Sequence, residues 1–156
     1  DERFHSRYQA VEKTYLYRIH PGKIPEVFER RYVYDYTEPL DVNRMRKAAE
    51  YLCGTHDFKS FCGNKKMKKS TVRTISRIQI KELPEEIQIY YTGNGFLQNM
   101  VRILTGTLIE IGDGRRTPED VSEILEAKNR ERAGYTAPAC GLTLLEVIYG
   151  KMVCNK

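Results

Sequence analysis

The stretch at residues 93–112, GNGFLQNMVRILTGTLIEIG, decides the fold because it predicts a helix that is apolar on nearly every side. At helical spacing one apolar stripe is made by Leu97, Val101, Leu104, Leu108 and Ile111. The apolar surface is extended round the helix by Phe96, Ile103 and Ile109. A helix of this kind belongs in the centre of a domain. Its one cation, Arg102, falls beside the stripe, on the side of Asn99 and Gly106.

Arg102 needs a partner that offsets the loss of its hydration. A guanidinium in an apolar place requires a carboxylate, a phosphate or several carbonyl oxygens. Glu110 and Glu146 are the candidates for a structural salt bridge within the chain. In the alternative interpretation, Arg102 holds a catalytic or substrate anion. Sequence spacing leaves both interpretations open.

Alternating side chains predict several strands. The pattern occurs at residues 14–19, 30–36, 75–80 and 87–91. The last two runs are separated by KELPEE and are expected to form a β-hairpin. Residues 142–149 are apolar on both faces, which predicts a strand in the interior of a sheet.

Two further helices flank the central one. Asp41 is expected to cap the first, which is closed by Gly54. Its buried face is predicted to consist of Val42, Met45, Ala48, Ala49 and Leu52. Thr117 is expected to cap the second, with Pro118 at the first position and Gly134 at the end.

No repeat or linker divides the chain, so residues 1–156 are expected to form a single domain. The elements do not alternate strictly between strand and helix. We therefore predict the α+β class, with a mainly antiparallel sheet and about three helices packed on it.

Charge is compatible with an anionic partner. The net charge is +5, and residues 56–73 read as an irregular basic loop. Its cluster consists of Lys65, Lys66, Lys68, Lys69 and Arg73. Such a loop either contacts several phosphates or is simply solvated. The 11 tyrosines offer platforms for base stacking, although a strand tyrosine also serves sheet packing.

Several site classes find no support in the sequence. Four cysteines, at positions 53, 62, 140 and 154, lack both CxxC spacing and histidine partners, so neither zinc nor a disulfide framework is indicated. We expect reduced thiols, a cytoplasmic location and no metal. No run approaches membrane length, and the three histidines have no catalytic companions in sequence.

Five ordered segments carry a specific resemblance. They are FHSRYQAVEKTYLYRI, HDFKSF, VRTISRIQI, GNGFLQNMVRILTGTLIEIG and AGYTAPACGLTLLEVIY. Over nearly the whole chain they resemble the C-terminal half of the bacterial tRNA pseudouridine synthase A (TruA) family. The resemblance implies a pseudouridine synthase-like fold. The family's catalytic aspartate lies in a GRTDxGVHA-type segment of the N-terminal half, and this sequence contains no such segment.

The resemblance also implies roles for individual residues. Arg102 matches the arginine that pairs with the catalytic aspartate, here expected on the missing half. Tyr15 matches the tyrosine that stacks on the flipped-out uracil and is implicated in proton handling at C5. Leu144 matches an apolar residue that lines the same pocket. Arg7 and the loop from Lys65 to Arg73 are expected to contact RNA.

The implied reaction is the isomerisation of uridine to pseudouridine in the tRNA anticodon stem-loop, at positions 38 to 40, without cofactor or metal. The family's enzymes are homodimers, and one RNA touches both subunits. We expect this chain alone to be inactive because it lacks the aspartate. The alternative is a non-catalytic basic RNA-binding module in which Arg102 binds phosphate. A third interpretation is a purely structural domain whose charge is incidental.

Overall fold

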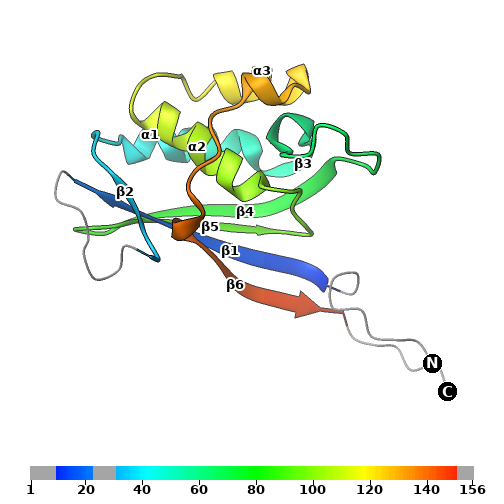
Figure 1. Ribbon diagram of the computed structural model, residues 1–156, viewed down its shortest axis with the longest axis horizontal. Coiled ribbons are helices and arrows are strands. Elements are labelled where there is room, and N and C mark those ends of the chain that lie inside the picture. The colour runs from blue at the N-terminus through cyan, green and yellow to red at the C-terminus, as the bar shows by residue number, and fades with distance from the viewer. Residues whose placement is uncertain (1–9, 23–30, 151–156) are drawn as a thin grey trace.

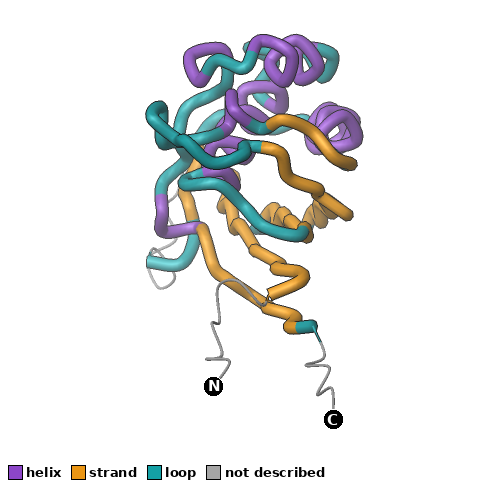
Figure 2. The backbone as a smooth tube through the Cα atoms, turned by 90° about the vertical axis from the view of Figure 1, so that its right-hand side faces the viewer, coloured by secondary structure: helices purple, strands orange, loops and turns teal. Residues whose placement is uncertain are grey.

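A computed structural model describes residues 10–22 and 31–150 of the chain. Six strands of these residues form one sheet in the order β2-β1-β5-β4-β3, and β6 pairs with the edge of β1 that β2 also uses. The three α-helices of the described residues lie on one face of the sheet (Figure 1), and a side view shows the same layers (Figure 2). The α+β prediction is confirmed.

The elements have the following bounds. The strands are β1 (Ala10–Pro21), β2 (Tyr34–Tyr36), β3 (Gly54–Asp57), β4 (Val72–Glu82), β5 (Ile87–Gly93) and β6 (Leu142–Tyr149). The helices are α1 (Val42–Leu52), α2 (Met100–Gly112) and α3 (Asp120–Ala127). Short 3-10 turns occur at Lys59–Phe61, Arg130–Arg132 and Ala139–Gly141.

Helix α2 forms the centre of the core, as its sequence predicts. Every residue of α2 is buried except Arg102 and Glu110. The core beneath it includes Tyr17 of β1 and Tyr91 of β5, both fully buried. The hydroxyls of Tyr91 and Thr105 lie 2.8 Å apart, so the buried phenol has a hydrogen-bond partner.

The start of α2 differs from the prediction. The helix begins at Met100, whereas the apolar pattern extended back to Phe96 and Leu97. Asn99 has a left-handed φ of 57°, which cannot continue into a preceding helical turn. Phe96 and Leu97 therefore lie in the turn between β5 and α2.

Helix α1 confirms its predicted cap and buried face. The Oδ1 atom of Asp41 accepts hydrogen bonds from the backbone N–H groups of Asn43 at 2.9 Å and Arg44 at 3.1 Å. These bonds satisfy donors that have no partner inside the helix. The buried residues are Val42, Met45, Ala48, Ala49 and Leu52. The helix ends at Leu52, and Gly54 follows with a φ of +100° that favours glycine.

Strands β4 and β5 form the predicted antiparallel hairpin, but β2 and β3 depart from expectation. In residues 31–36, the described part of the predicted second strand, only Tyr34–Tyr36 forms a strand, and it pairs in parallel with β1. The long connection after Pro21 permits parallel pairing, which a tight hairpin turn would exclude. Strand β3 was missed because its sequence, GTHD, lacks the apolar alternation of a half-buried strand.

Both ends of α3 and the position of β6 were also predicted wrongly. The helix begins at Asp120 after the N-cap residue Glu119, so Thr117 is not its cap and Pro118 is not its first residue. Helix α3 ends at Ala127, where Lys128 adopts a left-handed φ of 47°, and not at Gly134. Strand β6 lies at the edge of the sheet and pairs only with β1 among the described strands. Leu144 and Leu145 are 49% and 53% exposed although they face opposite sides of the strand. The interior position predicted for β6 therefore does not occur here.

Segment 134–137 runs directly against α2. The N–H of Gly134 donates to Thr107 Oγ1 at 2.9 Å, and the N–H of Ala137 donates to the carbonyl of Arg102 at 3.1 Å. Gly106 permits this approach, since a Cβ there would lie 1.9 Å from the carbonyl oxygen of Tyr135. The packing of α2 on this segment therefore requires glycine at position 106, since any side chain there would meet the Tyr135 backbone.

We predict that Gly106→Ala lowers the free energy of unfolding by at least about 2 kcal/mol, because the added methyl group must displace backbone atoms. Urea denaturation measures the effect. Gly95→Ala is the matched control, since its nearest neighbours are atoms of Arg73 at 3.8 Å. Equal stability changes in the two variants would contradict the close contact.

Candidate functional site

Arg102, in the first turn of α2, is held by carbonyl oxygens. Its Nε donates to the backbone oxygen of Ala137 at 2.6 Å, and its Nη1 donates to Asn99 Oδ1 at 3.3 Å. The return bond from Ala137 N–H to the Arg102 carbonyl fixes the segment against the helix. The guanidinium is therefore oriented by neutral groups and keeps donors for an additional acceptor.

The carboxylates proposed as in-chain partners of Arg102 are not bonded to it. Glu110 Oε2 lies 2.5 Å from Nε of Arg116, and its Oε1 accepts the N–H of Tyr135 at 3.3 Å. Glu146 is exposed on β6, opposite Thr14. Within residues 10–22 and 31–150, no carboxylate lies within ion-pair distance of Arg102. The internal salt bridge considered from the sequence is therefore not formed among these residues.

Tyr15 lies on β1 beside an apolar wall. It is directly opposite Leu144 in the β1–β6 register, so the two side chains share a face of the sheet. The Tyr15 ring packs edge-on against Phe96, with centroids 5.3 Å apart and an interplanar angle of 85°. This is a favourable aromatic geometry. Two residues predicted for the site, Tyr15 and Leu144, are thus neighbours.

Arg102 is linked to the same face of β1 through Tyr17. Tyr15 and Tyr17 are two residues apart on a strand, so their side chains point the same way. The Tyr17 hydroxyl donates to the carbonyl of Pro138 at 2.6 Å, next to Ala137, which accepts the Arg102 bond. Burial raises the pKa of Tyr17, and the nearby Arg102 charge lowers it by a smaller amount. Tyr17 therefore stays neutral beneath the site.

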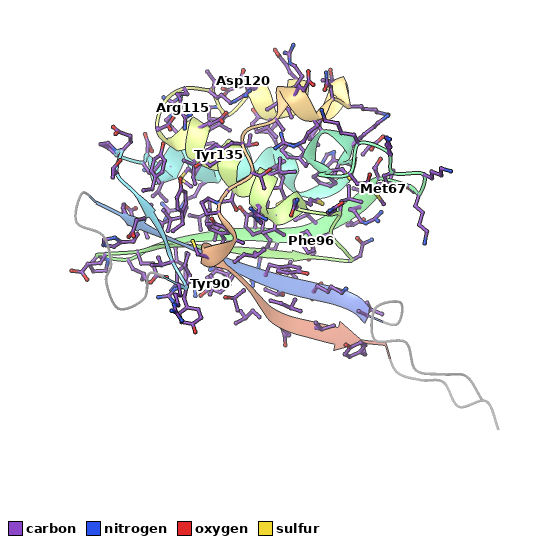
Figure 3. The ribbon with its side chains drawn as sticks, viewed as in Figure 1. Met67, Tyr90, Phe96, Arg115, Asp120 and Tyr135 are labelled. Carbon is purple, nitrogen blue, oxygen red and sulfur yellow. The ribbon has the colours of Figure 1, made fainter. Side chains whose placement is uncertain are left out.

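Two cavities of about 540 and 440 Å³ share part of their lining and are bordered by residues 64–71, which we call the basic loop, and by the start of β4. Arg73, predicted as part of the loop, lies on β4. Both are lined by Met67, Lys69, Arg73 and Phe96. Figure 3 shows Phe96 and Met67 at the same end of the molecule. The N–H of Gly63 donates to the Gln98 carbonyl at 2.8 Å, which anchors the loop to the turn before α2. We call these two cavities together the basic groove.

The groove divides the predicted basic cluster. Lys66, Lys68, Lys69 and Arg73 line it, whereas Lys65 lines a different cavity and lies 3.5 Å from Glu131 Oε1. Arg7 lies outside the described residues. The basic cluster, which the sequence suggests is one patch, therefore lines two different cavities.

Phe96 and Lys13 were not predicted as site residues. Phe96 lines both cavities of the groove and its ring packs on Tyr15, so it connects the basic groove with Tyr15. Lys13 lines the groove and precedes Tyr15 by two positions on β1. Because residues two apart on a strand share a face, the spacing of Lys13 and Tyr15 was a signal for Lys13. Phe96 gave no such signal, because its sequence pattern assigned it to the helix surface.

The described residues carry no metal cluster, disulfide or membrane-spanning helix. No group of three or more histidine, cysteine or acidic side chains among them is placed to hold a metal ion. Cys53, Cys62 and Cys140 are free thiols. No helix in this part of the chain is long and apolar enough to cross a bilayer.

The family model and the curated relatives that match this chain carry the same description. A sequence model described as "tRNA pseudouridine synthase" matches residues 48–150. The chain is 50% identical over 148 residues to tRNA pseudouridine synthase A 1 of Bacillus cereus, covering 95% of this chain and 60% of the relative. It is 48% identical over 149 residues to tRNA pseudouridine synthase A of Bacillus subtilis, covering 96% of this chain and 60% of the relative.

The chain thus spans about 60% of the length of these curated relatives. The matches are consistent with the C-terminal domain of tRNA pseudouridine synthase A. From the family match and these identities, the chain belongs to the tRNA pseudouridine synthase family.

Proposed function

We propose that this chain is the C-terminal part of an enzyme that isomerises uridine to pseudouridine in the tRNA anticodon stem-loop, at positions 38 to 40. The observation that carries the proposal is Arg102, whose guanidinium is bonded, among the described residues, to two carbonyl oxygens and to no carboxylate. A cation so placed, in the first turn of α2, favours an anion from outside the described residues. Family membership supports the reaction class.

The reaction needs a uridine that has left its base stack, because a stacked base hides its reacting atoms. Tyr15 would stack on the flipped uracil, with Phe96 supporting its ring and Leu144 covering the base. During the reaction the bond between ribose C1′ and uracil N1 breaks and a bond from C1′ to C5 forms. The C5 proton is removed and N1 becomes protonated.

The nucleophile is proposed to be an aspartate carried by a segment that this sequence lacks. Arg102 would keep that carboxylate ionised and aimed at the uridine, because a cation at short range lowers a carboxyl pKa. The hydrogen bond that Arg102 Nε donates to the Ala137 carbonyl fixes the direction of the guanidinium before the aspartate arrives. Neither a metal nor a cofactor is needed for these steps.

The remaining part of the enzyme is proposed to cover β6. Among the described strands, β6 has a neighbour on one side only, and it exposes Leu144, Leu145 and Ile148. An apolar edge strand of this kind is normally paired or covered. The relatives extend well beyond the matched length, so they contain a further segment of suitable size. We extend the proposal to a cytoplasmic homodimer in which one RNA touches both subunits.

The first test is tritium release from tRNA labelled at uridine C5. We expect no release from this chain alone, and release after mixing with the separately produced N-terminal segment of the Bacillus subtilis relative. Turnover by the chain alone would contradict the missing nucleophile. RNA binding without turnover in the mixture would support the non-catalytic RNA-binding module, which the basic groove also favours.

The second test addresses Arg102 in the assembled enzyme. Arg102→Met should lower kcat about 100- to 1000-fold, as expected for loss of a preorganised charge. Without the cation the carboxyl pKa rises, so the acid limb of the pH–rate profile should move to higher pH. Arg132→Met is the control, because Arg132 is exposed and lies 3.9 Å from Glu123. An unchanged acid limb in Arg102→Met would contradict the ion pair.

The third test addresses the surface of β6. Leu145→Glu should weaken binding of the N-terminal segment at least about tenfold, because a charge would be buried in an apolar contact. Leu83→Glu is the control, since Leu83 is also exposed but lies in the β4–β5 turn. Analytical ultracentrifugation measures both affinities. Equal affinities would show that β6 is not the covered surface.

A further inference from the structure

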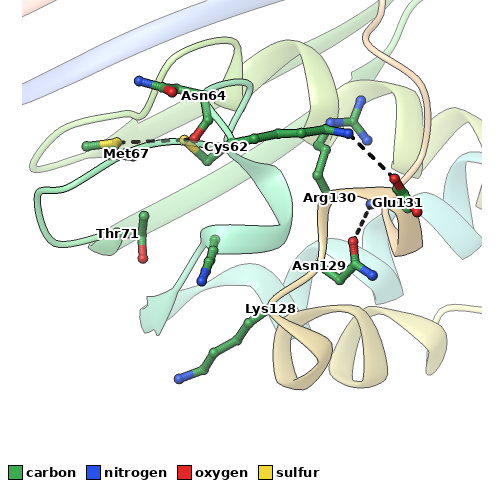
Figure 4. Close-up of a pocket in the computed structure, with 10 residues that line it drawn as sticks. Cys62, Asn64, Met67, Thr71, Lys128, Asn129, Arg130 and Glu131 are labelled. Carbon is green, nitrogen blue, oxygen red and sulfur yellow. Dashed lines mark hydrogen bonds and ion pairs between the residues drawn. The ribbon is translucent and has the colours of Figure 1, made fainter.

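A third cavity is lined by residues of the basic loop, and neither Tyr15 nor Arg102 is among its lining residues. Its volume is about 230 Å³, and it separates the loop after the Lys59–Phe61 turn from the segment after α3. Figure 4 shows Cys62 and Met67 on one side and Lys128 to Glu131 on the other. We call this cavity the rear pocket.

Cationic side chains dominate the rear pocket. Lys59, Lys65, Lys128 and Arg130 line it, together with a single carboxylate, Glu131. Cations drawn from two segments far apart in sequence form a compact positive site, and such a site attracts an anion.

Two of these cations already have acidic partners. Lys65 lies 3.5 Å from Glu131, with both side chains largely exposed, and Lys128 Nζ lies 3.1 Å from Asp57 Oδ2. The Lys65–Glu131 pair is exposed on both sides, and such pairs contribute little to stability. Among the described residues, neither Lys59 nor Arg130 forms an ion pair.

Arg130 is the part of the pocket that most requires an anion. Its Nη1 donates to the Gly134 carbonyl at 2.8 Å and its Nη2 donates to Thr136 Oγ1 at 3.0 Å, both neutral acceptors. No carboxylate of the described residues lies within ion-pair distance. Burial lowers the pKa of Arg130, and only the more distant Glu110 opposes this effect. The guanidinium is oriented but not neutralised.

The two walls of the pocket are joined by a buried serine. Ser60 Oγ donates to the Ile124 carbonyl at 2.5 Å and accepts the N–H of Asn129 at 2.9 Å. Asn129 Oδ1 in turn accepts the N–H of Glu131 at 3.0 Å. A site held by buried hydrogen bonds loses little freedom when it binds a ligand. The pocket is therefore preformed.

The rear pocket shares a wall with the basic groove. Met67 lines the pocket and both cavities of the groove. Lys65 points to the pocket side, while Lys66 and Lys68 line the groove side. A nucleic-acid strand bound along the loop could therefore place one phosphate in the pocket.

We propose that the rear pocket binds a phosphate group through Lys59 and Arg130, and that the phosphate belongs to the backbone of the RNA held in the groove. The RNA source rests on the proposed function, whereas the phosphate chemistry rests on the pocket alone. A guanidinium suits this ligand because its planar N–H donors match phosphate oxygens. The site would position RNA without reading its sequence.

The test compares Arg130→Gln and Lys59→Gln with Arg132→Gln, which removes the same charge from an exposed residue outside the pocket. In the RNA arm, this chain is titrated with an anticodon stem-loop RNA at several salt concentrations. We expect about tenfold weaker binding for each pocket variant. The slope of log affinity against log salt should fall by about 0.7 to 1. Arg132→Gln should change affinity less than about twofold.

In the phosphate arm, inorganic phosphate is compared with chloride at equal ionic strength. Phosphate should raise the Tm of the wild-type chain and of Arg132→Gln, but not of Arg130→Gln. Lys59→Gln guards against a folding defect, because the Lys59 side chain is exposed at the surface.

Weaker RNA binding in the first arm together with loss of the phosphate-dependent rise in Tm in the second arm supports the proposal. A loss in the phosphate arm alone would keep the phosphate site and overturn RNA as its source. Equal behaviour of all three variants in both arms would overturn the site. Neither arm measures turnover, so the outcome is independent of whether the mixed halves isomerise uridine.

Discussion

The burial of α2 against α1, β5 and residues 134–137 is the constraint on which the other parts of the structure depend. A helix apolar on almost every side must be covered on almost every side, so the chain returns after α3 and lays residues 134–137 along it. Gly106 and Gly134 permit contact at backbone distance. Residues 134–137 are followed by the short turn Ala139–Gly141 and then by β6. The packing of this segment on α2 therefore places β6 at the edge of β1.

The candidate site is a consequence of the same packing. Arg102 and Tyr17 hold consecutive residues of the returning segment, Ala137 and Pro138, through side-chain bonds to their carbonyl oxygens. Tyr15 is the next residue on that face of β1, and Leu144 is its neighbour on β6. The structural role of Arg102 therefore uses its Nε, while part of its guanidinium can bind an anion. One residue thus connects the core of the domain with its proposed chemistry.

Much of the fold could be predicted from local patterns. The burial of α2, the Asp41 cap and the β4–β5 hairpin follow from periodicity and turn chemistry, which depend on neighbouring residues only. The exposure of β6 could not be predicted in this way, since an apolar strand does not show which element covers it. The parallel pairing of β2 likewise depends on a distant strand.

The site shows the same division. Arg102 stood out because a cation interrupts an apolar pattern, and Tyr15 and Leu144 were identified by resemblance to a family. Phe96 was missed because its role depends on the left-handed Asn99, which ends the helix before reaching it. The division of Lys65 from Lys66 depends on the path of the loop, which a run of charges does not determine.

NMR of the Arg102 side chain can test whether Arg102 receives its carboxylate from another segment. Spectra of this chain alone are compared with spectra after addition of the N-terminal segment, and of that segment with its catalytic aspartate changed to asparagine. We expect the guanidinium N–H signals to shift and to exchange more slowly only with the intact aspartate. Identical Arg102 signals with both segments, under conditions where each binds, would contradict it.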